Sequence, residues 1–587
     1  MSLYSSILFF FLTALLVSLS QSQSQSQSPS SACKSSLYPK LCRSIISSIG
    51  TSPSDPYNYG KFSVKQCLKQ ARKTSDVIHR YLHNHKRRQS MSLAEYNAME
   101  DCHELSQLNV EYLGSISEEL KSAETMNDEL VDRVRTLLSG ILTNQQTCYD
   151  GLVVSGNGVV AGGGVLSNAT RVYSVALGLV SNALARNTKK QPKRGNGSGR
   201  DYGFPSGGHP VREHLTTLIK TLRRRSSCNK SRGSCSSSPK VERILGDHME
   251  DEKSSGILVS EMVTVSPYGA EYGDNFTTIG DAIAFAPNNS KPEDGYFVIY
   301  AKQGYYEEYI VIPKHKKNLM LLGDGINLTV ITGNHSVIDG WTTFNSSTFA
   351  VSGEKFIAID VTFKNTAGPA KHQAVAVRNN ADLSTFYRCS FEGYQDTLYV
   401  HSLRQFYRDC YIYGTVDFIF GNAAAIFQNC NIYARKPMLN QKNAVTAQGR
   451  TDPNQNTGIS IHNCTIEAAP DLAVDLTNYS TLNYLGRPWK EYSRTVIMQS
   501  YIGDLISPNG WLEWNGSVGL DTLYYGEFEN YGPGANTSNR VKWGGYNLMN
   551  VSQAMNFTVL NFTSASTWLL QTDIPFYGGL LEKSSDD

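Results

Sequence analysis

A four-residue phrase centred on cysteine recurs in the C-terminal half of this 587-residue chain and limits its possible folds. The copies occupy residues 388–391, 409–412, 429–432 and 463–466, and each ends in a hydrophobic residue. The first three cysteines are 21 and then 20 residues apart. A repeat of about 20 residues with three short strands fits one turn of a parallel β-helix, whose turns stack about 4.8 Å apart.

Short β-rich runs surround this repeat and alternate with turn signals, whereas helical periodicity is mostly confined to residues 281–286. Many short strands at regular spacing are typical of a sandwich, a barrel or a solenoid. The cysteine repeat favours the solenoid over a β-sandwich. The cysteines are then expected to stack as small core residues, or to pair where the geometry allows. The clearest predicted strands are 296–301, 309–312, 319–322, 328–332 and 356–363.

The N-terminal part reads as helical, because its apolar residues recur at helical spacing. Cys33 and Cys42 flank a short loop, and Cys102 and Cys148 each lie on a long periodic segment. A helix bundle closed by Cys33–Cys42 and Cys102–Cys148 disulfides would fit and would leave Cys67 free. Spacing alone does not fix this pairing. The periodic residues include Leu130, Val134, Leu137, Leu138, Ile141 and Leu142.

The first residues indicate the compartment. Residues 7–17 are almost entirely apolar and small polar residues follow, which is typical of a secretory signal peptide. A signal anchor is the alternative, because no basic residue precedes the run. Secretion agrees with roughly fifteen Asn-x-Ser/Thr sites, among them Asn345, and with eleven cysteines, whose odd number leaves at least one unpaired.

A Gly-, Ser-, Lys- and Arg-rich segment separates the helical and β-rich parts and is expected to be a linker. Its candidate processing sites are Arg223-Arg224-Arg225 and Arg243-Ile244-Leu245, and its Cys228 and Cys235 could close a small loop or stay free. From Gly256 onward, 22 Lys+Arg against 31 Asp+Glu give a net charge of −9, and the remainder has 32 − 21 = +11. The linker is too rich in Gly and Ser to indicate a nucleic-acid site.

The expected organisation is therefore a multidomain chain, an all-α helical bundle followed by an all-β parallel β-helix. The segments are a signal peptide at 1–20, a low-complexity spacer at 21–30, the bundle at 31–185, the linker at 186–255 and the β-helix at 256–587.

The repeat also places polar residues on one face of the β-helix. Asp396 and Asp417 are 21 residues apart, the same step as Cys389 to Cys410. They should therefore lie side by side on adjacent turns. Gln373 and Gln395 are 22 residues apart, so Gln373 is expected one turn earlier on that face, and the nearby aromatic residues Tyr399, Phe418 and Phe420 could line a sugar-binding cleft.

Two carboxylates about one strand spacing apart cannot both ionise cheaply, so one should hold a proton. Such a pair supplies an acid and a nucleophile or base. Two neighbouring amides offer N–H donors to a developing oxyanion, which favours acyl transfer over the glycosidase chemistry that two carboxylates alone would equally suggest.

Several strings of the β-rich part resemble the plant pectin methylesterase family and occur in that family's order. The resemblance covers essentially residues 256–580 and implies a secreted cell-wall enzyme with a right-handed parallel β-helix that hydrolyses galacturonate methyl esters of pectin. The strings are Gly304-Tyr305-Tyr306-Glu307-Glu308, Gln373-Ala374-Val375-Ala376, Gln395-Asp396-Thr397-Leu398-Tyr399, Val416-Asp417-Phe418-Ile419-Phe420-Gly421 and Leu485-Gly486-Arg487-Pro488-Trp489.

The resemblance implies a role for each polar residue of the face. Asp417 looks like the nucleophile and Asp396 like the general acid and then base. Gln373 and Gln395 look like oxyanion stabilisers, and Arg487 looks like the partner that keeps Asp417 ionised and oriented.

Further residues are expected to contact the substrate or to form a disulfide. Trp489 and Thr343 look like substrate contacts, and Cys430–Cys464 is the disulfide that the resemblance favours in the β-helix. We expect no cofactor and no metal ion, because no zinc-type spacing and no phosphate loop is present.

The helical part resembles the pectin methylesterase inhibitor family, a four-helix bundle with Cys33–Cys42 and Cys102–Cys148 disulfides. The resemblance implies an intramolecular inhibitor or a folding aid, a processing protease at the linker, and separate inhibitor proteins as possible partners. The strings that carry it are Tyr38-Pro39, Glu100-Asp101-Cys102 and Leu142-Thr143-Asn144-Gln145-Gln146-Thr147-Cys148.

Three other interpretations remain open at this point. An unrelated all-α spacer could stand in place of the inhibitor domain, or the bundle could be the working part and the β-helix inert. The β-helix could also be a pectate lyase or a polygalacturonase, although the carboxylate cluster that a lyase uses to bind calcium is not visible.

Overall fold

The structure is a computed structural model that describes residues 28–49, 56–123, 127–156, 164–187, 242–243, 257–269, 274–476 and 481–582. The expected signal peptide and most of the expected spacer and linker lie outside the described residues. So do Cys228, Cys235 and the first candidate processing site.

The N-terminal part is the predicted four-helix bundle. Its long helices are α4 (Pro56–Leu82), α6 (Leu93–Ser122), α7 (Asp128–Val154) and α9 (Gly164–Asn187). Each packs on the next and α9 returns to α4. The predicted apolar stripe faces this core, and Ser92 and Glu95 form a capping box that starts α6. The short helices before and between them are α2 (Pro29–Ala32), α3 (Pro39–Ser47) and α5 (His85–Ser90).

The Cys33–Cys42 and Cys102–Cys148 disulfides are both present, and Cys67 is a buried free thiol, as predicted. The first fastens the N-terminal turn to α3, and the second joins α6 to α7. Two neighbouring helices of the bundle are therefore fixed in register relative to one another.

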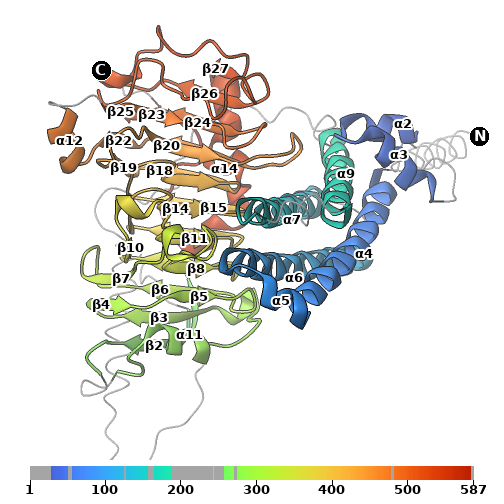
Figure 1. Cartoon of the computed structure of the whole chain (residues 1–587), viewed down its shortest axis with the longest axis horizontal. Coiled ribbons are helices and arrows are strands. Elements are labelled where there is room, and N and C mark those ends of the chain that lie inside the picture. The colour runs from blue at the N-terminus through green and yellow to red at the C-terminus, as the bar shows by residue number, and fades with distance from the viewer. Residues whose placement is uncertain are drawn as a thin grey trace, which may run out of the picture.

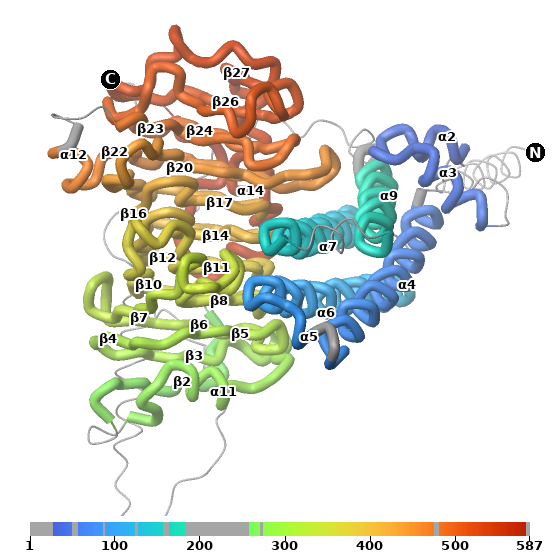
Figure 2. The backbone as a smooth tube through the Cα atoms, in the orientation of Figure 1, coloured from blue at the N-terminus to red at the C-terminus, as the bar shows by residue number. Residues whose placement is uncertain are grey.

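The C-terminal part is a β-helix of three parallel sheets, as Figures 1 and 2 show. Every strand pair within these sheets is parallel except β1 with β2.

The first sheet has twelve strands: β1 (Glu242–Arg243), β2 (Leu258–Val265), β3 (Tyr296–Ala301), β6 (Leu319–Leu322), β9 (Ile357–Ile359), β12 (Ser384–Tyr387), β15 (Arg404–Arg408), β18 (Ala424–Gln428), β21 (Gly458–His462), β24 (Arg494–Met498), β26 (Tyr524–Phe528) and β27 (Tyr546–Leu548). The second has eight: β4 (Gly304–Glu307), β7 (Thr329–Gly333), β10 (Thr362–Asn365), β13 (Ser390–Glu392), β16 (Tyr411–Gly414), β19 (Asn431–Ala434), β22 (Thr465–Ala468) and β25 (Tyr501–Ile502). The third has seven: β5 (Ile310–Ile312), β8 (Phe349–Val351), β11 (Val377–Asn379), β14 (Leu398–Val400), β17 (Ile419–Gly421), β20 (Asn443–Gln448) and β23 (Asn483–Gly486).

The recurring cysteine phrase marks one corner of each turn, between the first and the second sheet. The residue before each of the four cysteines has a positive φ, from 50° at Arg388 to 57° at Asn429. This left-handed conformation turns the chain sharply, and Asp and Asn adopt it more readily than most residues. The equivalent Asp360 has a φ of 60° and divides the predicted strand 356–363 into β9 and β10.

The predicted Cys430–Cys464 disulfide is absent, and this expectation was wrong. Cys389, Cys410, Cys430 and Cys464 are all buried free thiols that stack along the core. They occupy the same position on successive turns, since Asn431 pairs in register with Thr465. Neighbours in a parallel ladder are about 4.8 Å apart with side chains that point the same way, whereas a disulfide needs Cβ atoms about 3.8 Å apart and converging.

Short helices and the C-terminal segment close the β-helix. The predicted helix at 281–286 is α11 (Ile279–Phe285), which covers the N-terminal end of the core. The C-terminal segment packs Val559, Trp568 and Phe576 against the outer face of the first sheet. The other α-helices of the β-helix domain are α12 (Pro470–Leu476), α13 (Val551–Ala554) and α14 (Val559–Phe562). The 3₁₀ helices are η1 (Cys33–Ser35), η3 (Pro292–Asp294), η4 (Val337–Asp339), η5 (Pro369–Lys371), η6 (Pro533–Ala535), η7 (Met555–Phe557), η8 (Ala565–Thr567) and η9 (Leu569–Thr572).

The bundle lies against the middle turns of the β-helix, with α6 and α7 nearer to it than α4 (Figure 1). Buried residues of these two helices form one apolar cluster with Phe344, Val375, Tyr399, Leu403 and Phe420 of the β-helix. The two domains therefore share a packed interface. None of the helices that the structure describes is long and apolar enough to cross a membrane.

The thiol assignment can be tested by alkylation. Unfolding the chain in denaturant without a reductant should let iodoacetamide label Cys430 and Cys464, as read by peptide mass spectrometry. Cys102 and Cys148 should resist labelling until a reductant is added. A Cys430–Cys464 disulfide-linked peptide would contradict the assignment.

Candidate active site

Asp396 and Asp417 stand at the same corner of adjacent turns, as the 21-residue step predicted. Leu398 of β14 pairs with Ile419 of β17, and each aspartate lies two residues before its strand. Both have left-handed backbones, with φ of 63° and 54°. Non-glycine residues in this region cost about 1–2 kcal/mol, a strain often found at functional sites.

Arg487 fixes the second carboxylate. It follows β23, and its Nε and Nη2 donate to the two carboxylate oxygens of Asp417 at 2.7 Å each. The guanidinium carbon also lies 4.4 Å from the ring centroid of Trp514. A two-point fork of this kind holds the carboxylate in one orientation.

The two carboxyl groups have different electrostatic surroundings. Burial raises the pKa of Asp396 well above its usual range, and the charge of Asp417 raises it further, against a weaker opposing effect of Arg487. Burial also raises the pKa of Asp417, but the hydrogen bonds and the charge of Arg487 oppose that rise. Asp396 is therefore the better proton holder and Asp417 the better anion.

The two predicted glutamines both line the cavity that contains the carboxyl groups. Gln395 immediately precedes Asp396, and its buried Oε1 has no hydrogen-bond partner among the residues that the structure describes. Because Val377 pairs with Leu398, the local step is 21 residues and Gln373 is in register with Tyr394, not with Gln395. The predicted one-turn alignment of the glutamines is therefore displaced by one residue, although both side chains reach the cavity.

The cavity has a volume of about 580 Å³ and several aromatic walls. Tyr399 stacks on Phe420 with ring centroids 4.1 Å apart, and Trp489 lies edge-on to both. Thr343 and Trp489 line it, as expected for substrate contacts. Trp341 and Trp514 line it too, and sequence reasoning missed both. Trp341 is only two residues before Thr343, whereas Trp514 has no predicted site residue near it in the sequence.

Phe418 does not line the cavity, and that prediction was wrong. It is fully buried in the core of the β-helix. The left-handed corner at Asp417 turns the next side chain inward, and the alternation of β17 then brings Phe420 outward.

The roof of the cavity comes from the helical bundle. Residues from the C-terminal end of α7 and Asp101 of α6 line it together with the carboxyl groups. Thr147 lies 3.0 Å from Nε2 of His401, and Asp150 accepts from Lys490 at 2.8 Å. The sequence analysis included Thr147 in a string that resembles the inhibitor family, but it predicted no contact for this residue. The roof residues are Ala94, Asp101, Thr147, Asp150, Gly151, Val153, Val154 and Ser155.

These features define a class of protein. A solenoid that presents polar catalytic-type groups and stacking aromatic residues along one flank is suited to a long carbohydrate chain, and the carboxyl groups are arranged for hydrolysis. The β-helix is thus of the carbohydrate-active hydrolase type.

Comparisons with known proteins give the family. A family model described as "Pectinesterase" matches residues 262–566, and one described as "Plant invertase/pectin methylesterase inhibitor" matches residues 27–185. The "Probable pectinesterase/pectinesterase inhibitor 47" of Arabidopsis thaliana is 64% identical over 552 residues, which cover 94% of this chain and 86% of that protein. The "Probable pectinesterase/pectinesterase inhibitor 25" of Arabidopsis thaliana is 62% identical, over 94% of this chain and 87% of that protein.

A solved structure, "Pectin methylesterase from Carrot", is 53% identical, with a TM-score of 0.52 over 54% of this chain and 98% of that one. This chain belongs to the pectinesterase family, in the form that carries an inhibitor-type domain before the catalytic one. It is a carboxylic ester hydrolase, so the lyase, polygalacturonase and inert β-helix interpretations are set aside.

The fork between Arg487 and Asp417 generates a pH prediction. Arg487→Lys loses the two-point contact and should lower kcat by about 10²-fold. Because Arg487 holds the pKa of Asp417 down, the acidic limb of the kcat/KM profile should also move to higher pH. Initial-rate assays across pH would measure both effects, and a lowered rate with an unmoved acidic limb would contradict a role of the two hydrogen bonds in lowering the pKa of Asp417.

Proposed function

We propose that the β-helix hydrolyses galacturonate methyl esters in pectin, with Asp417 as the nucleophile and Asp396 as the acid and base. This assignment rests on the two hydrogen bonds from Arg487 to Asp417. They orient Asp417 as an anion, while Asp396 on the adjacent turn holds a proton.

The two carboxyl groups divide the reaction into two steps. Asp417 attacks the ester carbonyl, Gln373 and Gln395 stabilise the oxyanion, and Asp396 gives its proton to the departing methanol. Asp396 then takes a proton from water, which attacks the acyl-enzyme and releases the free galacturonate and Asp417. Trp489 and Thr343 contact the sugar chain, with Trp489 stacking on a ring face.

The compartment and the partners follow from the same assignment. Pectin lies in the plant cell wall, so the chain acts after secretion, and its N-terminal apolar run is the signal peptide. A protease that cuts the linker, and separate inhibitor proteins, are further partners consistent with a basic linker and an inhibitor-type fold.

Replacing the nucleophile tests the esterase assignment. Asp417→Asn, measured after removal of the bundle, should lower methanol release from methylated pectin by about 10⁴-fold or more, because an amide cannot form the acyl-enzyme. Circular dichroism should report an intact β-helix. Retained turnover in a folded variant would refute the role of Asp417.

The bundle inhibits its own β-helix in this proposal, because α6 and α7 roof the cavity that a pectin chain must enter. Buried polar contacts from α7 and α9 help to hold the bundle on the β-helix: Asn422 Nδ2 donates to Thr143 at 2.9 Å, and Ser174 Oγ donates to Asp452 at 2.5 Å. A polymer that reaches the carboxyl groups would have to displace the bundle and break these contacts.

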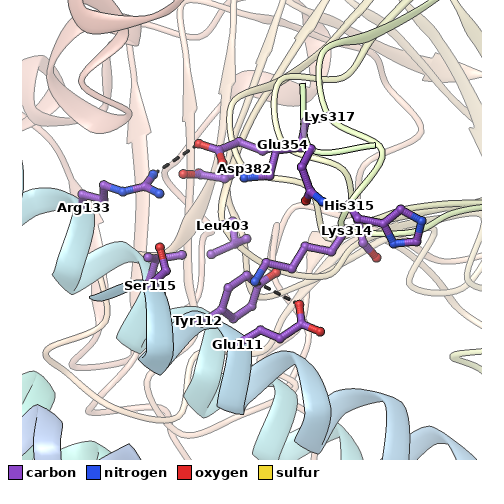
Figure 3. Close-up of a pocket in the computed structure, with 13 residues that line it drawn as sticks. Glu111, Tyr112, Ser115, Arg133, Lys314, His315, Lys317, Glu354, Asp382 and Leu403 are labelled. Atoms are coloured by element: carbon purple, nitrogen blue, oxygen red, sulfur yellow. Dashed lines mark hydrogen bonds and ion pairs between the residues drawn. The ribbon is translucent and has the colours of Figure 1, made fainter. Parts of the chain in front are cut away.

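Ion pairs also join the two domains at a part of the interface that shares no lining residue with the cavity over the carboxyl groups. Figure 3 shows two of them beside a second cavity of about 180 Å³, Arg133 with Glu354 at 3.2 Å and Lys314 with Glu111 at 3.1 Å. All four side chains are partly exposed, so each pair contributes little alone and is screened by salt. An interface rich in such pairs can dissociate once the linker is cut.

Opening the roof should activate the uncleaved chain. Asp150→Arg replaces the ion pair with Lys490 by a repulsion and should raise pectin hydrolysis by uncleaved protein about tenfold. The activity of the β-helix after linker cleavage should stay unchanged, because Asp150 belongs to the bundle. Glu118→Arg makes the same charge change at an exposed position of α6 and is the matched control. Equal effects of the two variants would contradict a local role.

Closure should also depend on pH. Burial at the interface raises the pKa of Asp101 to about 7, with Glu104 raising it further while Thr342, Arg378 and Asn345 oppose. The docked bundle therefore binds a proton more tightly than a separated one, whose Asp101 should titrate near about 3.9. Inhibition should therefore weaken as pH rises from about 4 to about 7 and change little above about 7, where Asp101 is ionised in both states.

The measurement is the activity ratio of uncleaved to cleaved protein from about pH 5 to about pH 8, which cancels the pH dependence of catalysis itself. Asp101→Asn should flatten this ratio. An unchanged pH dependence in that variant would show that another group controls closure.

A further inference from the structure

The loop that leads into β8 carries a glycosylation sequence at the interface between the two domains. Asn345-Ser346-Ser347 has the Asn-x-Ser pattern that accepts an N-linked glycan in secreted proteins. Asn345 is only partly exposed, and Ser346 and Ser347 are buried. The loop is covered on one side by α6.

The amide nitrogen that a glycan would occupy faces the bundle. Nδ2 of Asn345 donates to Oδ1 of Asp101 at 2.6 Å, and Asp101 is 3% exposed. Next to this contact, Nδ2 of Asn97 donates to the carbonyl oxygen of Gly340 at 2.8 Å. A Cβ atom added at Gly340 would lie 3.2 Å from Cδ2 of Leu93, so helix and loop are already in close contact.

Other asparagines with this sequence pattern have different surroundings. Asn168, Asn536 and Asn550 are exposed on the surface. Of the pattern asparagines of the β-helix domain that the structure describes, Asn345 is the one whose side chain hydrogen-bonds to a residue of the bundle. A glycan at Asn345 would therefore have consequences that a glycan at Asn536 would not.

We propose that Asn345 is a glycan acceptor and that its glycan and the docked bundle exclude one another. The donor is an oligosaccharide linked through diphosphate to a lipid. The sugar C1–O bond to diphosphate breaks, a C1–Nδ2 bond forms, and the proton from Nδ2 leaves with the diphosphate lipid. The inference rests on the proposed secretion and the proposed inhibition by the bundle.

The exclusion has a steric and an electrostatic origin. A branched oligosaccharide at Nδ2 cannot share the space that α6 occupies over the loop. Moving the amide to avoid the helix would take the Nδ2 donor away from Asp101, and a buried carboxyl group that loses a partner is destabilised. The open arrangement removes both conflicts, since Asp101 and the glycan then reach solvent.

Glycan transfer precedes closure, because Nδ2 is shielded once the bundle has docked. Chains modified at Asn345 then remain open and active before the linker is cut, whereas unmodified chains close and wait for the protease. One sequence would thus yield a constitutively active and a latent form.

The test uses uncleaved full-length protein from a secretory host, separated from cleaved protein by size and then into fractions on a lectin column. Peptide N-glycosidase converts a glycosylated asparagine to aspartate, so peptide masses report the occupancy of Asn345 in each fraction. Pectin hydrolysis per uncleaved chain should be about tenfold higher in fractions with Asn345 occupied.

Two variants test whether the effect on activity comes from the glycan at Asn345 and not from the Asn345–Asp101 hydrogen bond or from another glycan. Ser347→Ala removes the acceptor pattern but keeps the Asn345–Asp101 hydrogen bond, and it should shift all uncleaved chains to the low-activity form. Asn536→Gln removes an exposed acceptor site and should leave the distribution of activities as in the unaltered chain.

Two results would overturn the inference: an inhibited uncleaved chain with Asn345 occupied, or the absence of any glycan at Asn345. Activity after linker cleavage is measured in parallel on every sample. If the cleaved protein releases no methanol the proposed function fails, whereas active cleaved protein with no dependence on Asn345 occupancy refutes this inference alone.

Discussion

The rest of the β-helix depends on one constraint, the stacking of successive turns in hydrogen-bonded register. Parallel strands can only pair in this way if every turn bends at the same places, and left-handed residues such as Asp409 and Asn429 provide the bend. A small buried residue must follow each bend so that the inner corner can close, and cysteine fills this position on four turns. The same requirement at another corner sets Asp396 beside Asp417. The stacking of the turns therefore places the two aspartates side by side, and each carries a modest backbone strain.

The electrostatic surroundings of Asp396 and Asp417 then give these two chemically identical side chains different pKa values. Burial alone would raise the pKa of both aspartates, and their mutual repulsion would leave the proton shared. The fork from Arg487 removes this ambiguity because it contacts both oxygens of Asp417 and neither of Asp396 in the structure's hydrogen-bond pattern. The Trp514 ring on the guanidinium excludes water from one side of that contact. A buried ion pair of this kind is better understood as a device for orientation than as a source of stability.

The cleft that is proposed to bind a sugar chain is also the surface on which the bundle docks. Its aromatic walls and partly desolvated polar groups give α7 a surface on which to dock, and Thr147 and Asp150 use it. Besides the shared apolar cluster, ion pairs and hydrogen bonds join the two domains, and the ion pairs at partly exposed positions weaken as salt rises. Asp101 and Asn345 lie at this border, one sensitive to protons and the other to glycan transfer. Closure is therefore open to control without any change in the catalytic groups.

Local periodicity and a repeat length, which a linear chain displays directly, were enough to predict the two folds, the order of the domains and the pairing of Asp396 with Asp417. The disulfides Cys33–Cys42 and Cys102–Cys148 were predicted from the resemblance to the inhibitor family, because spacing alone does not fix their pairing. The Cys430–Cys464 disulfide, which the resemblance to the esterase family favoured, is absent because the two side chains stack on adjacent turns without converging. Phe418 was misplaced because the left-handed corner at Asp417 interrupts the alternation that sequence patterns assume. The position of the bundle over the carboxyl groups and the contact between Asp101 and Asn345 could not be predicted from the sequence, since contacts between residues 244 positions apart depend on how two folded surfaces fit.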